Sequence, residues 1–191
     1  MEAVMAQERS RSKIPSKKFA LYVACVSMLM MFAAFTSAYV VRQAAGNWLE
    51  FRLPNIFWYN TIVLIASSIT LHLSYTNFKN NNTLLYRALL VVTFILGLAF
   101  VALQYQGWLA LEEIGVELTG NPSGSFVYVI SGVHAAHILG GLAVLTIALI
   151  HAFALPHKVT ASRKLRFDLT LTFWHFVDFL WIYLIVFFTL Q

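Results

Sequence analysis

An acidic side chain within an apolar run is the first feature of this sequence that could carry chemistry. Asp178 has His175 three residues earlier on the same helical face, and Trp174 and Trp181 lie on either side of the pair. If this run crosses a membrane, a charge at its centre costs roughly 2.5–3.5 kcal/mol on insertion scales, so such an acid is normally partnered inside the protein. We therefore expect Asp178 to have a polar neighbour on another helix.

Two histidines in the preceding apolar run, His134 and His137, are also three residues apart. One interpretation is a metal or haem site, because histidine is the commonest metal ligand and helical bundles build such sites. Another is a proton relay through Asp178, although no further acids continue a path across the membrane. We favour a third, in which a histidine of this run, or a Ser or Thr of the second run, hydrogen bonds to Asp178 and joins two helices. The expected layer is structural, with no catalytic, cofactor-binding or metal-binding residue, and comprises Trp174, His175, Asp178, Trp181, His134 and His137.

Five apolar runs separated by short polar segments must position these residues. Each run is close to the ~20 residues that cross a ~30 Å hydrocarbon core as a helix. Backbone groups in lipid must bond within their own segment, which favours helices. The sequence therefore predicts an all-α integral membrane bundle of five transmembrane helices, at approximately Phe19–Val41, Ile56–Phe78, Tyr86–Trp108, Phe126–His151 and Leu169–Leu190.

The composition excludes an ordinary soluble domain. Of the 191 residues, 60% are hydrophobic and 11% are charged, against about 25% charged in soluble domains. The mean hydropathy is +0.74. Such a chain cannot cover itself with polar surface and needs lipid around it. The single cysteine, Cys25, allows no disulfide within the chain.

The basic residues indicate an orientation in the membrane. Of 13 Lys and Arg residues, 11 lie in the N-terminal arm, at the two ends of the loop between the second and third runs (Lys79 and Arg87), or between the fourth and fifth runs. Arg42 and Arg52 lie on the opposite side. The positive-inside rule then places the N-terminus in the cytoplasm and the C-terminus outside. Residues 1–18 form a basic cytoplasmic arm and residues 19–191 a membrane domain. The net charge of +5 thus reflects topology and affinity for anionic lipid, with no nucleic acid as partner.

Small residues in the fourth run predict close helix packing. Gly132, Ala136 and Gly140 recur every four residues, and this spacing lets helix backbones approach each other.

Two segments resemble a known family. Residues 173–181 read FWHFVDFLW and closely resemble the WHFVDxxW signature of subunit III of cytochrome c and quinol oxidases. Residues 132–140 read GVHAAHILG and are similar to the family's GxHxxHxxxG pattern. The resemblance extends over about residues 18–190.

The resemblance implies a non-catalytic subunit III of a respiratory haem–copper terminal oxidase in a bacterial inner membrane. It implies that the chain packs on catalytic subunit I, which holds the haem and copper, and supports its stability and its proton uptake during reduction of oxygen to water. Other oxidase subunits, membrane lipids and a larger respiratory supercomplex are further expected partners. The residues alone leave two alternatives, a small membrane transporter and a metal-binding membrane protein with a His/Asp polar core.

This sequence departs from the family pattern in two ways. Many members have seven helices, and the five expected here correspond to the last five. Longer relatives also carry a glutamate early in the first shared helix, where this chain has Met28. A role of that glutamate is therefore not expected here.

Overall fold

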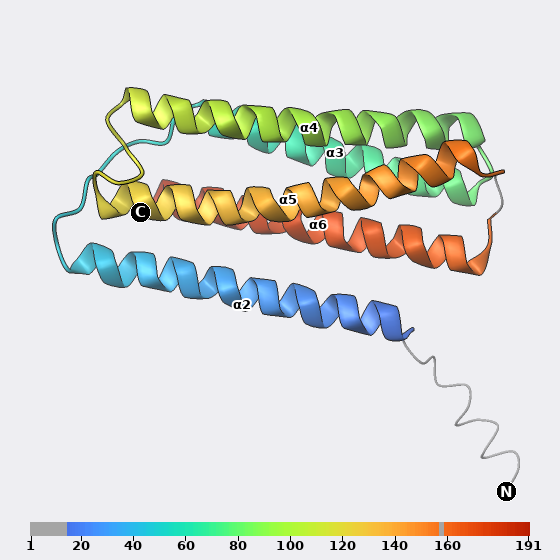
Figure 1. Cartoon of the computed structure of the whole chain (residues 1–191), viewed down its shortest axis with the longest axis horizontal. Coiled ribbons are helices and arrows are strands. Elements are labelled where there is room, and N and C mark those ends of the chain that lie inside the picture. Colours follow the sequence, from blue (N-terminus) through green and yellow to red (C-terminus); the bar gives the residue numbers. More distant parts are fainter. Residues whose placement is uncertain (1–14, 157–158) are drawn as a thin grey trace, which may run out of the picture.

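The computed structural model describes residues 15–156 and 159–191, which form five long helices (Figure 1). All five are long and apolar enough to cross a membrane, and the predicted all-α bundle is confirmed. Most of the predicted basic arm, residues 1–14, lies outside the described residues, as does Lys158. The helices are α2 (Ser16–Ala44), α3 (Ile56–Lys79), α4 (Thr83–Glu113), α5 (Pro122–Ala154) and α6 (Ala161–Leu190).

Every helix continues beyond the apolar run that predicted it, and α6 begins eight residues before the expected Leu169. Apolar content marks only the part of a helix that lies in lipid, whereas the end of the helix is set by its cap. The Thr160 hydroxyl accepts a hydrogen bond from the Arg163 backbone N–H at 3.3 Å and so caps α6. Asn82 and Asn121 cap α4 and α5 with their side-chain oxygens.

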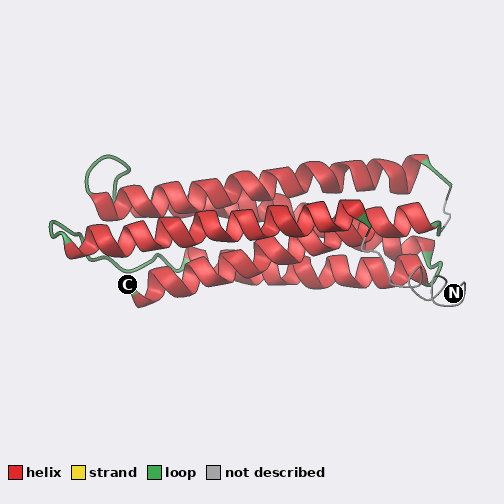
Figure 2. Ribbon diagram, turned by 90° about the horizontal axis from the view of Figure 1, so that it is seen from below, coloured by secondary structure: helices red, strands yellow, loops and turns green. Residues whose placement is uncertain are grey.

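Successive helices run in alternating directions along one long axis (Figures 1 and 2). α3 and α4 form an antiparallel pair joined by a short turn, in which Asn81 adopts a left-handed conformation with φ of 58°. α5 and α6 lie against this pair, and α2 runs along the outside of the bundle, where it contacts α5 and α6.

The packing centre of the described bundle is α6, which contacts α2, α3 and α5. Its fully buried side chains include Leu180 and Leu184. At its start, the Asp168 carboxylate forms an ion pair with the Lys18 ammonium of α2 at 2.7 Å. Asp178, His175 and the two tryptophans therefore sit on a helix with three neighbours, as do His134 and His137 on α5, which contacts α2, α4 and α6.

Candidate functional site

Two tryptophans of α6 attach this helix to α3. Trp174 and Trp181 are fully buried. The Trp174 indole N–H donates to the Ser67 hydroxyl at 3.0 Å, and the Trp181 indole N–H donates to the Thr61 hydroxyl at 3.1 Å. A buried indole N–H needs such a partner, because an unpaired donor keeps its full desolvation cost.

Two histidines lie side by side where α3 and α6 meet. His175 is half-buried, and its Nδ1 hydrogen bonds to the Ser68 hydroxyl of α3. His72 of α3 is exposed, and its ring centroid is 5.9 Å from that of His175. The polar neighbours of His175 thus come from α3, the second predicted run, and not from α5.

Asp178 is buried on the same helix, with 4% of its surface exposed. Neither of its carboxylate oxygens has a hydrogen-bond partner among the described residues. The Ser68 hydroxyl lies beside it, but the hydrogen bond of that hydroxyl goes to His175. No hydrogen bond joins Asp178 to a histidine of α5 in the described part of the chain, so the geometry differs from the pairing that we favoured.

A difference in depth along the bundle does not explain why Asp178 forms no hydrogen bond with His137. Asp178 lies 17 residues after the start of α6 at Ala161, and His137 lies 17 residues before the end of α5 at Ala154. At 1.5 Å per residue, both are about 26 Å from the same end of the bundle. The directions of the side chains keep them apart, because His137 Nδ1 contacts the Val133 carbonyl of its own helix at 2.7 Å.

The two histidines of α5 have different surroundings. His134 is fully buried, stacks on Trp181 with ring centroids 5.0 Å apart, and has no hydrogen-bond partner for either ring nitrogen among the described residues. His137 is half-buried and has Phe32 of α2 at 5.9 Å. His134 therefore packs as an aromatic ring against α6, whereas His137 lies beside α2.

Close helix packing at α5 involves a glycine that the spacing argument did not select. A Cβ on Gly141 would lie 2.9 Å from the Trp174 ring, so this ring occupies the space that a side chain would need. Gly140 has nothing within 4 Å of such a position, and Ala136 is exposed. Gly132 meets only Trp108, at 3.9 Å. Of these three small residues, Ala136 and Gly140 thus lie on the described surface, and Gly132 alone is near a neighbouring helix, α4.

Sequence reasoning missed a polar stripe on α3 that faces the core. Asn60, Ser67 and Ser74 recur every seven residues and are all buried. Asn60 donates to the Gln104 side chain of α4 at 3.0 Å, and Ser74 donates to the Tyr86 carbonyl of α4 at 2.9 Å. The seven-residue spacing was the available signal, because such a repeat keeps side chains on one helix face.

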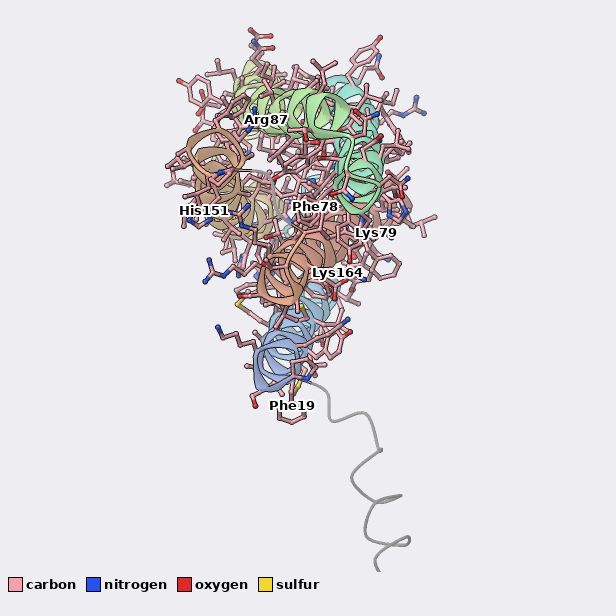
Figure 3. The ribbon with its side chains drawn as sticks, turned by 90° about the vertical axis from the view of Figure 1, so that its right-hand side faces the viewer. Phe19, Phe78, Lys79, Arg87, His151 and Lys164 are labelled. Atoms are coloured by element: carbon pink, nitrogen blue, oxygen red, sulfur yellow. The ribbon has the colours of Figure 1, made fainter. Side chains whose placement is uncertain are left out.

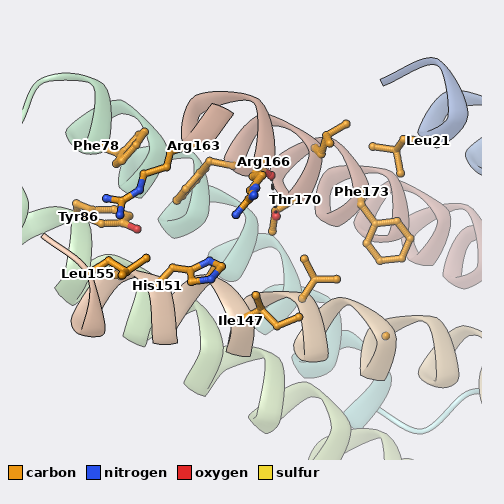
Figure 4. Close-up of a pocket in the computed structure, with 16 residues that line it drawn as sticks. Leu21, Phe78, Tyr86, Ile147, His151, Leu155, Arg163, Arg166, Thr170 and Phe173 are labelled. Carbon is orange, nitrogen blue, oxygen red and sulfur yellow. Dashed lines mark hydrogen bonds between the residues drawn. The ribbon is translucent and has the colours of Figure 1, made fainter. Parts of the chain in front are cut away.

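A surface cavity of about 650 Å³ opens between α5 and α6. Figure 4 shows its basic end, formed by Arg163, Arg166 and His151, and its apolar wall, which includes Ile147 and Phe173. Leu21 of α2 also lines it. The cavity therefore combines a long apolar surface with cationic groups at one end.

Residues 18–190 match the family described as cytochrome c oxidase subunit III. The chain belongs to this family. It is 30% identical over 166 residues to the probable cytochrome c oxidase subunit 3 of Nocardia farcinica, and 32% identical over 165 residues to that of Mycobacterium tuberculosis. Each of these comparisons covers 82% of this chain and 78% of the relative. It is 27% identical over 178 residues to the cytochrome c oxidase subunit 3 of Synechocystis, covering 89% of this chain and 73% of the relative.

The two motifs that resemble subunit III lie on neighbouring helices of this member of the family. The α6 motif supplies both buried tryptophans and Asp178. In the α5 motif, His134 is buried, while Gly140 is exposed. Met28, at the position where the family resemblance would place an acid, is half-buried on α2.

Subunit III membership does not favour the transporter and metal-binding alternatives. Over the described ranges, no three or more His, Cys, Asp or Glu side chains lie close enough together to hold a metal ion. The chain is a non-catalytic oxidase subunit III with a multi-pass membrane fold.

Proposed function

We propose that this chain packs on the catalytic subunit of a respiratory haem–copper oxidase, stabilises that subunit and supports its proton uptake during oxygen reduction. The observation that carries the proposal is the family match over residues 18–190. The haem and copper would lie in the catalytic partner. The described polar side chains of this chain would contribute by fixing its helices against each other and by shaping its surface towards the partner.

The test is to purify the oxidase in mild detergent from cells that carry this chain with an affinity tag. The catalytic subunit, with its haem absorbance, should copurify. Oxidase made without this chain should turn over initially and then lose activity faster than the complete complex. Failure of any haem-containing subunit to copurify would overturn the proposal.

An orientation with the N-terminus in the cytoplasm of a bacterium forms part of this proposal. Figure 3 looks at the end of the bundle where Lys79, Arg87 and Lys164 gather. Arg42 and Arg52 belong to the opposite end. The asymmetry of Lys and Arg supports placing the first of these ends in the cytoplasm.

The cavity between α5 and α6 supports membrane lipid as a further partner. Its apolar wall suits an acyl chain, and Arg163 and Arg166 suit the phosphate of a head group. Lipid extraction from the purified complex, compared between the native chain and an Arg166→Gln variant, tests this assignment. Unchanged phospholipid content in the variant would count against it.

A further inference from the structure

The exposed surface where α3 meets α6 carries imidazole groups near the middle of the bundle. His175 lies 14 residues after the start of α6 and 15 before its end, so it is at mid-length. Ser68 is likewise at the middle of α3, and His72 follows one turn later. We name Ile65, Ile69 and His72 of α3, together with His175 and Phe179 of α6, the α3–α6 face. All five are exposed or half-buried.

The imidazoles of this face have unused hydrogen-bonding capacity. Ser68 occupies Nδ1 of His175, so Nε2 of that ring has no partner among the described residues. Both ring nitrogens of His72 likewise have no hydrogen-bond partner among the described residues, since its contact with His175 is a ring–ring contact. Hydrocarbon tails offer neither donors nor acceptors, and polar side chains within membrane spans almost always face protein or a water-filled cavity.

The exposed surfaces of the other described helices place fewer unpartnered ring nitrogens near mid-length. His137 of α5 is half-buried and bonds through Nδ1 to the Val133 carbonyl, so only its Nε2 lacks a described partner, against three such nitrogens on the α3–α6 face. α4 presents Val92, Ile95 and Leu98, which suit lipid. The exposed hydroxyls of Ser27 on α2 and Thr146 on α5 donate to carbonyls of their own helices at 3.0 and 2.8 Å. A hydroxyl that donates to a carbonyl of its own helix needs no hydrogen-bond partner from another chain. Among the described exposed surfaces, the α3–α6 face is therefore the one that lipid suits worst.

We propose that the α3–α6 face is the surface on which the catalytic subunit packs, through a transmembrane helix that brings a hydrogen-bond acceptor, a carboxylate above all, opposite His72 and His175. This inference rests on the proposed function and adds the place of contact. A neutral imidazole carries one N–H in either tautomer, so His72, whose two ring nitrogens have no partner among the described residues, offers a donor to the partner. The isoleucines of the face supply the apolar contact around this polar centre, while the outer surface of α4 remains in lipid.

Two isoleucines provide a matched test. Ile69 of the α3–α6 face is 56% exposed and Ile95 of α4 is 57% exposed, and each is within three residues of the middle of its helix. Ile69→Trp should overpack the contact and weaken association with the catalytic subunit roughly tenfold or more, because added volume in a packed interface forces its atoms apart. Ile95→Trp should leave association unchanged. The measurement is the amount of catalytic subunit recovered with the tagged chain over a detergent dilution series.

A second measurement does not depend on a destabilising substitution. A photoreactive amino acid at Ile69, in the otherwise unchanged complex, should crosslink to the catalytic subunit, whereas the same group at Ile95 should not. His72→Leu should lower recovery of the catalytic subunit, and His72→Gln, which keeps hydrogen-bonding groups, should restore most of it.

The outcomes separate this inference from the proposed function. If the unchanged chain does not copurify with an oxidase, the proposed function fails. If it copurifies but Ile95→Trp releases it and Ile69→Trp does not, or if crosslinks form at Ile95 alone, the contact surface is wrong and the proposed function stands.

Discussion

Asp178 is a carboxyl group in the middle of the bundle with no hydrogen-bond partner among the described residues. Structural polar pairs between transmembrane helices contribute only about 0.6 kcal/mol on average, so an acid is not retained there for the strength of one bond. Ser68 lies beside it, and Trp174, His175 and Trp181 are within one helical turn of it on α6. We interpret Asp178 as a packing residue of this layer.

Asp178→Asn should accordingly keep the subunit bound and most oxidase turnover intact. The amide has nearly the same shape, and the substitution removes a group whose charged form is costly to bury. The measurement is subunit retention in the purified complex together with oxygen consumption over many turnovers. Full retention with immediate loss of proton-coupled turnover would instead identify Asp178 as a proton carrier.

The lack of Asp and Glu in α2, with Met28 where the family resemblance would place an acid, gives a second prediction for single residues. A hydrophobic carbodiimide reacts with carboxyl groups within the membrane, and α2 contains no Asp or Glu. Mass spectrometry of the treated complex should find no adduct between Ser16 and Ala44. An adduct in that range would mean that the departure from the family pattern has been misread.

The residues of the polar layer could be selected from the sequence, but their partners could not. An acid and histidines in an apolar run are conspicuous because lipid makes them costly. Whether His137 or Ser68 faces α6 depends on the rotation of each helix about its axis, which a run of uniformly apolar residues leaves undetermined. Asn60 was missed because a single amide next to the start of a run looks like an interfacial residue.

Two adjacent glycines of α5 have different environments, one packed against α6 and one on the surface. Gly141 faces the Trp174 ring at contact distance, whereas Gly140 has open space around it. Recurrence every four residues identified Gly140 and not Gly141. Spacing alone indicates that small residues share a face, and does not indicate whether that face meets a helix of the same chain.

Gly141→Ala should destabilise the helix bundle by about 1–3 kcal/mol, because the added methyl would overlap the Trp174 ring. That ring is fully buried and also lies 3.0 Å from the Cβ position of Gly97. Gly140→Ala is the matched control and should be close to neutral. Thermal inactivation of the purified complex, or its resistance to detergent, gives the comparison. Equal stability of the two variants would contradict the packing described for Trp174.

The number of helices could be predicted from the sequence, whereas their boundaries could be predicted only in part. The five runs were found because lipid selects about 20 apolar residues per span. The early start of α6 at Ala161 was not found, because Arg163, Lys164 and Arg166 extend a helix beyond the hydrocarbon without changing its backbone. With α6 beginning at Ala161, Asp178 lies at the same depth as His137 of α5.

At the scale of the whole molecule, five alternating helices put the two ends of the described chain at opposite ends of the bundle (Figure 1). The basic end shown in Figure 3 should face the cytoplasm.

Single cysteines at Ser10 and Gln191 test this orientation in a chain whose Cys25 is replaced by Ser. On intact cells, an impermeant thiol reagent should label the Gln191 position and not the Ser10 position. Permeabilised cells, in which both should react, provide the control. Labelling of Ser10 alone on intact cells would invert the topology.

The central place of α6 has a consequence for how the protein is made. The α3–α4 pair contains its own polar contacts, Asn60 with Gln104 and Thr70 with Thr93, so it can form a stable hairpin soon after the ribosome releases α4. Thr61 and Ser67 instead receive their indole donors from α6, the last of the five described helices in chain order. The Thr61 and Ser67 hydroxyls also donate to carbonyls of α3, at 2.8 and 2.7 Å, and these bonds need no other helix. During translation α3 can therefore remain in the bilayer with its hydroxyl protons paired, until the Trp174 and Trp181 indoles arrive and hold α6 against it.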